Sequence, residues 1–150
     1  MRRRVRLTVT GLTATALTAA AATTTASAAT LRAPTCATVS LALVRRSLGD
    51  AATPPKTQTS RNVVICHYTI VDLIYLLHQT KTDFATDQTA NHGTPVPGIG
   101  TAAFTYGHKG RVISLEILDR NTTFIISGSS AGLPHLKQLA ERMVPLVRGG

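Results

Sequence analysis

The strongest constraint on the fold of this chain is its pair of cysteines, Cys36 and Cys66, the only two among 150 residues. About 30 residues separate them, so a bond between them would contribute about 3.5 kcal/mol by restricting the unfolded chain. That is a large share of the net stability of a small domain. Whether the cysteines pair depends on the compartment in which the chain folds.

The first 28 residues predict that the chain is exported. Four arginines stand among the first six residues, an uncharged stretch starts at Leu7, and small residues occupy positions 26–28. This is the order of a secretory signal peptide, and we expect cleavage after Ala28. Threonines dilute the apolar stretch, which falls short of the roughly 20 apolar residues that a membrane anchor needs. The Arg-Arg pair at positions 3 and 4 leaves both the general and the twin-arginine export routes open.

An oxidising compartment favours a disulfide between Cys36 and Cys66. Two alternatives compete with it. One is lipid attachment at Cys36, as in lipoproteins, but Arg32 and Pro34 stand where such proteins have a small, apolar lead-in. Zinc binding requires further ligands, and the five histidines show no metal-ligand spacing. We expect a structural disulfide, no metal ion and no cofactor.

Removal of 28 residues from 150 leaves 122, a length that suits one domain at 29–150. The same cleavage removes four arginines and lowers the formal net charge from +9 to +5. The remaining basic residues are scattered, and the chain has only three Tyr, three Phe and no Trp for stacking on bases. We therefore expect no nucleic-acid partner. A monomer of this charge would be attracted loosely to an anionic cell wall.

Two segments have the apolar spacing of amphipathic helices. In the segment 40–49, Ser40 can cap the start and Gly49 can end the helix. In the segment 133–147, apolar residues recur at helical spacing, with Pro145 expected to weaken the last turn.

Most of the intervening chain predicts strands. The segments 62–70 and 71–77 read as two strands or one long bent strand, and 101–106 as another. The clearest hairpin joins 111–118 to 123–127, with Ser114 and Glu116 on the polar side. The polar segment 50–61 reads as a loop, and 79–92 as a surface loop or weak helix. We therefore predict an α+β fold, in which an antiparallel sheet of about five strands is covered by an N-terminal and a C-terminal helix.

One motif suggests catalysis. Gly128-Ser129-Ser130-Ala131-Gly132 matches Gly-x-Ser-x-Gly, the nucleophile elbow of serine hydrolases, and stands between a strand and a helix. In those enzymes the acid and the histidine follow the serine on later strands, whereas here one helix with His135 and Glu141 follows. The glycines also suit the end of a strand and the start of a helix. Ser130 is thus a candidate nucleophile that its context disfavours.

The other reactive residues form no clear constellation. His67 adjoins Cys66, but a disulfide removes the thiolate that a cysteine-histidine pair requires. No two of the seven acidic residues are brought together by their spacing on a predicted face. We expect no catalytic residues.

Five features occur together along the chain: Cys36, the Leu48-Gly49 helix end, Cys66-His67-Tyr68, the segment VPGIGTAAF at 96–104, and Leu-x-x-Leu-Ala at 136–140. In this combination they resemble a large actinobacterial family of small exported proteins and lipoproteins, over residues 36–147. The resemblance implies fold and location only, because the family's domain has no assigned function. Many members are lipid-anchored, and the missing lead-in before Cys36 favours release or loose wall association.

The favoured hypothesis is a secreted, non-catalytic domain that binds an extracellular or cell-envelope partner. One alternative is a small secreted serine hydrolase that uses Ser130. Another is a secreted protease inhibitor that presents a loop at 52–60. For a binding protein, the long segment 79–97 is the first place to look, since loops on a rigid scaffold tend to carry binding.

Overall fold

The computed structural model describes residues 33–108, 111–128 and 132–148. The elements in chain order are α1 (Leu41–Leu48), β1 (Lys56–Ser60), β2 (Val63–Tyr68), β3 (Val71–Leu77), α2 (Lys81–Ala90), β4 (Thr94–Pro95), β5 (Ala102–His108), β6 (Arg111–Asp119), β7 (Thr122–Ser127) and α3 (Leu133–Arg148). Within the described residues, seven strands form one antiparallel sheet in the order β1-β2-β3-β7-β6-β5-β4. The fold is α+β, as the sequence predicted.

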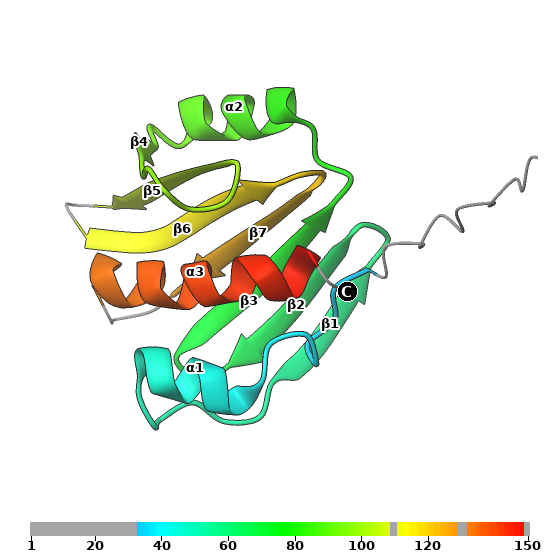
Figure 1. The fold of residues 1–150 in the computed structure, drawn as a ribbon, viewed down its shortest axis with the longest axis vertical. Coiled ribbons are helices and arrows are strands. Elements are labelled where there is room, and N and C mark those ends of the chain that lie inside the picture. Colours follow the sequence, from blue (N-terminus) through cyan, green and yellow to red (C-terminus); the bar gives the residue numbers. More distant parts are fainter. Residues whose placement is uncertain (1–32, 109–110, 129–131, 149–150) are drawn as a thin grey trace, which may run out of the picture.

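The two faces of the sheet are covered differently. Figure 1 shows α1 and α3 side by side over one face, which we call the inner face. Phe84 of α2 packs against Phe104 and Leu118 on the opposite, outer face. Neighbouring residues of a strand point to opposite faces, so the two layers draw on alternate residues of the same strands.

The main core lies between the inner face and α3. The hairpin of β6 and β7 supplies aliphatic and aromatic side chains that are fully buried. Helix α3 meets them with five buried residues at helical spacing: Leu136, Leu139, Ala140, Met143 and Val144. Burying a large apolar side chain contributes about 1.5 to 3 kcal/mol, so this layer accounts for much of the stability.

The structure confirms the predicted caps of helix α1. The Ser40 hydroxyl accepts a hydrogen bond from the Leu43 amide at 3.2 Å. The Gly49 amide donates to the Arg45 carbonyl at 2.8 Å, and Gly49 has a φ of 110°, which glycine adopts without strain. The helix therefore begins and ends where local sequence signals place its ends.

The sheet has more strands than the five expected. The segment 50–61, predicted as a loop, contains β1, and Thr94–Pro95 forms the short edge strand β4. All five side chains of β1 are exposed, so this strand lacks the apolar alternation by which a half-buried strand is recognised. It is held by backbone pairing with β2, from Lys56 opposite His67 to Ser60 opposite Val63. The segments 62–70 and 71–77 are two strands, as one of the two predictions had it.

Helix α2 is a third helix that the predicted architecture did not include. Its start is a capping box in which Asp83 accepts from the Thr80 amide at 2.9 Å and Thr80 accepts from the Asp83 amide at 3.2 Å. Its single buried side chain, Phe84, meets Phe104 edge to face, with ring centroids 4.9 Å apart. One aromatic anchor and a cap thus place a polar helix on the outer face.

The disulfide predicted from the cysteine count is present. Cys36 and Cys66 are bonded, with an S–S distance of 2.03 Å and a sequence separation of 30. Cys66 is fully buried in β2, whereas Cys36 lies in the segment before α1. The bond therefore ties the N-terminal segment of the described chain to the sheet.

We expect replacement of both cysteines by alanine to lower the free energy of unfolding by about 3.5 kcal/mol, because the open chain gains loop entropy when it unfolds. Urea unfolding followed by circular dichroism measures the loss. The Ala37→Ser variant, an exposed change beside Cys36, is the control and should unfold like the parent. An unchanged unfolding midpoint in the double variant would contradict the prediction.

Two glycines shape the connection between β4 and β5. Gly98 and Gly100 have φ values of 86° and 59°, both in the left-handed region. A Cβ atom on Gly98 would meet nothing within 4 Å, whereas one on Gly100 would lie 2.7 Å from the Leu118 carbonyl oxygen and 2.8 Å from Ile117 Cγ2. Gly100 therefore allows this connection to pack closely against β6.

Alanine substitutions at Gly98 and Gly100 distinguish the cost of backbone strain from the cost of steric overlap. Gly98→Ala should cost about 1 kcal/mol, the penalty for a left-handed φ. Gly100→Ala should cost about 1 to 3 kcal/mol more, because its Cβ displaces β6 as well. Thermal and urea unfolding of the two variants measure the difference. Equal losses would show that β6 gives way to the added methyl group without cost.

Candidate functional site

The residues singled out from the sequence lie in different parts of the molecule. Cys36 and Cys66 are joined in the disulfide, so neither is a thiolate. Ser130 lies outside the described residues, so the expectation that it is not a catalytic nucleophile stays a prediction. The segment 79–97, expected to be a binding loop, contains α2 and β4 instead.

His67 belongs to a polar row on the outer face. Its Nδ1 donates to Asp72 Oδ1 at 2.9 Å, and its Nε2 lies 3.5 Å from Gln58 Oε1. Ser127 lies opposite Asp72 in the pairing of β3 with β7, and its hydroxyl is 2.9 Å from that of Ser114. The acid thus stands between the histidine and the serine, whereas a catalytic triad requires the histidine between the other two. The row links strands and does not match hydrolytic chemistry.

Glu116 is the most unusual titratable group of the outer face. The sequence placed it on the polar side of β6, yet only 2% of the residue is exposed. Burial, reinforced by repulsion from Asp87 of α2, raises the pKa of Glu116 to about 7. Its Oε1 atom has no hydrogen-bond partner within the described protein, and neither has the buried Thr123 hydroxyl. The sequence analysis gave 79–92 as a surface loop or weak helix and did not predict that α2 would bring Asp87 close to Glu116, so this group was missed.

The raised pKa links stability to pH. The unfolded chain releases the Glu116 proton near its ordinary pKa of 4.5, whereas the native state keeps it up to about pH 7. The free energy of unfolding should therefore fall as the pH rises from 4.5 to 7, by about 3 kcal/mol, and should not recover above pH 7.

Glu116→Gln tests this linkage, because an amide cannot ionise. Urea unfolding across pH 4 to about 8 should show the variant gaining stability relative to the parent as the pH rises. The exposed Glu141 provides the matched control, and Glu141→Gln should run parallel to the parent. If Glu116→Gln also ran parallel, the buried carboxyl would not be the group that titrates.

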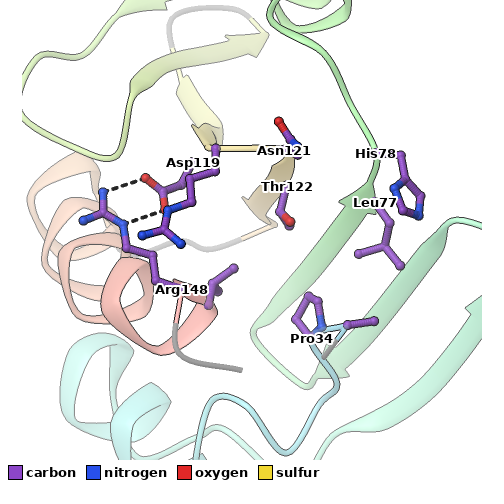
Figure 2. A pocket seen from close by; sticks show the side chains of 10 residues that line it. Pro34, Leu77, His78, Asp119, Asn121, Thr122 and Arg148 are labelled. Atoms are coloured by element: carbon purple, nitrogen blue, oxygen red, sulfur yellow. Dashed lines mark hydrogen bonds and ion pairs between the residues drawn. The ribbon is translucent and has the colours of Figure 1, made fainter. Parts of the chain in front are cut away.

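A cavity of about 330 Å³ lies at the opposite, inner face, where β3 and β6 end and β7 begins, near the C-terminus of α3. Figure 2 shows Asp119 and Arg148 on one side of it, Leu77 and His78 on the other, and Pro34 below. Pro34 comes from the segment that the disulfide holds, two residues before Cys36. Four separate stretches of chain therefore build the wall of this cavity.

A bidentate ion pair closes one side of the cavity. Arg148 Nε donates to Asp119 Oδ2 and Arg148 Nη2 to Asp119 Oδ1, each at 2.7 Å. The Asp119 side chain is 1% exposed, whereas that of Arg148 is 45% exposed. The hydrogen bonds and charge of Asp119 raise the pKa of Arg148 above its ordinary value. The pair fixes the end of α3 to the sheet while the outer part of the guanidinium stays accessible.

The turn between β6 and β7 supplies the remaining polar groups. Arg120 and Asn121 are exposed and Thr122 is half-buried, and all three line the cavity. Arg120 has a φ of 56°, and His78, on the other side of the cavity, has a φ of 66°. Both residues therefore occupy the left-handed region although neither is a glycine. The sequence predicts a turn at 119–122, but it contains no motif that indicates the cavity. The cavity is lined by residues from both ends of the domain, which come together only in the folded chain.

Two further observations concern the residues that the structure describes. None of their helices is long and apolar enough to cross a membrane. In the same residues, no three side chains of His, Cys, Asp or Glu are grouped so that they could hold a metal ion.

No family model, curated protein or solved structure matches this chain. The resemblance to the actinobacterial family of exported proteins therefore stays a prediction.

Proposed function

We propose that this chain is an exported, non-catalytic domain that binds a partner from the cell exterior or envelope, and that the cavity at the end of the inner face is its binding site. Export would remove residues 1–28 and leave the domain 29–150. The disulfide between Cys36 and Cys66 supports this, because such bonds persist in oxidising compartments.

The cavity is the observation that carries the proposal. Its volume of about 330 Å³ is within the usual range for ligand sites, and its wall combines apolar side chains with a few polar groups. Those polar groups come mostly from a tight turn on a rigid sheet, where binding residues are commonly placed. The residues that line it include no serine or cysteine, the usual nucleophiles of hydrolases. This composition suits binding better than covalent catalysis.

The two other hypotheses draw less support. For a protease inhibitor, the relevant segment is 52–60, but Lys56–Ser60 forms the strand β1, paired along its length with β2. For a serine hydrolase, the hydrogen-bonded pair His67–Asp72 is present on the outer face, but the cavity is lined by neither residue. Ser130 is best tested directly.

Intact mass spectrometry of the exported, non-reduced protein tests the proposal. We expect a chain that starts at Ala29, a mass lower by two hydrogens than the reduced form, and no adduct after treatment with a fluorophosphonate. A stoichiometric adduct that disappears in Ser130→Ala would overturn the non-catalytic assignment. Recovery of the chain only from inside the cells, with residues 1–28 still attached, would overturn export.

A further inference from the structure

The cavity at the end of the inner face also constrains the chemistry of its ligand. Its apolar wall comes from Ala33, Pro34, Leu77 and Val147. Because a water molecule occupies about 30 Å³ in the liquid, the cavity volume of about 330 Å³ accommodates on the order of ten non-hydrogen atoms. A ligand of this size with an apolar body would displace water from these side chains.

The charges around the cavity favour an anion. Two guanidinium groups, those of Arg120 and Arg148, line it, whereas Asp119 is its single carboxylate. Asp119 is buried, and both of its oxygens accept hydrogen bonds from Arg148. The negative charge is thus compensated within the protein, and the cavity keeps a formal excess of one positive charge.

Hydrogen-bond donors remain after the ion pair has formed. Asp119 takes two of the five N–H groups of Arg148, and 45% of that side chain is exposed. The Asn121 amide and the Thr122 hydroxyl add two neutral donors on the turn. A carboxylate accepts from several such donors at once, whereas an ammonium group would find only the neutral oxygens of Asn121 and Thr122 and would be repelled by the net positive charge.

We propose that the cavity binds a small amphipathic carboxylate, with its apolar chain against Pro34, Leu77 and Val147 and its carboxylate facing Arg120 and Arg148. This inference rests on the proposed function, since it takes the cavity as the binding site. The ion pair with Asp119 holds the guanidinium of Arg148 in place. The guanidinium of Arg120 supplies the positive charge that no carboxylate of the cavity compensates.

Three probes of about ten non-hydrogen atoms have nearly the same size and differ in their head groups, which are anionic, neutral and cationic: octanoate, octanamide and octylammonium. Each is titrated into the disulfide-bonded protein, and amide signals are followed by NMR. We expect octanoate to bind about tenfold more tightly than octanamide, as hydrogen bonds to a charged group are stronger, and octylammonium to bind more weakly than both. The signals of Leu77, Thr122 and Val147 should shift.

Substitution of Arg120 identifies the cation without breaking the buried pair. Arg120→Gln should weaken octanoate binding about tenfold and leave octanamide binding unchanged. The control is Arg46→Gln, which removes the same charge from an exposed position on α1 and should change neither affinity. The comparison of the three probes on the unaltered protein needs no variant, so it stands even if Arg120→Gln folds poorly.

The outcomes separate the two proposals. Equal binding of octanoate and octanamide at the cavity would overturn the carboxylate inference and leave the cavity as a binding site. Tighter binding of octylammonium would also overturn the inference. If none of the probes shifts the signals of Leu77, Thr122 or Val147, the cavity fails as a binding site and both proposals fall.

Discussion

The packing of α3 across the inner face is the interaction on which the rest of this structure depends. Its buried stripe, which includes Leu136, Leu139 and Met143, covers the hairpin of β6 and β7 and fixes the direction of the helix. That direction carries Arg148, at the end of α3, to Asp119 at the end of β6. The apolar core thus determines where the buried carboxylate finds its counter-charge, and the cavity lies beside that contact.

The disulfide has a second consequence besides stability. It holds the segment before α1 on β2, and Ala33 and Pro34 of that segment form part of the cavity wall. Reduction of the disulfide would remove the covalent bond that ties this part of the wall to the sheet. Under the proposed function, ligand binding would therefore depend on the formation of the disulfide.

The strand β6 shows how environment separates two carboxyl groups of similar chemistry. Glu116 and Asp119 are three residues apart, so they project from opposite faces of the sheet, and both are almost completely buried. Asp119 meets a guanidinium that compensates its charge. Glu116 meets the like charge of Asp87 and keeps its proton to a higher pH. One group anchors the fold, and the other makes its stability depend on pH.

The sequence by itself determined the features that rest on local rules. The caps of α1, the hairpin around 119–122, the helical stripe of α3 and the pairing of the only two cysteines all follow from neighbouring residues or from counting. Tertiary structure decided the rest. β1 has no buried side chain and exists because β2 offers it backbone partners, while α2 depends on the contact of Phe84 with Phe104. The cavity joins residues from both ends of the domain, and Glu116 is buried by a helix about 30 residues earlier in the chain. Such long-range contacts leave no period or spacing in the sequence, so packing alone could reveal them.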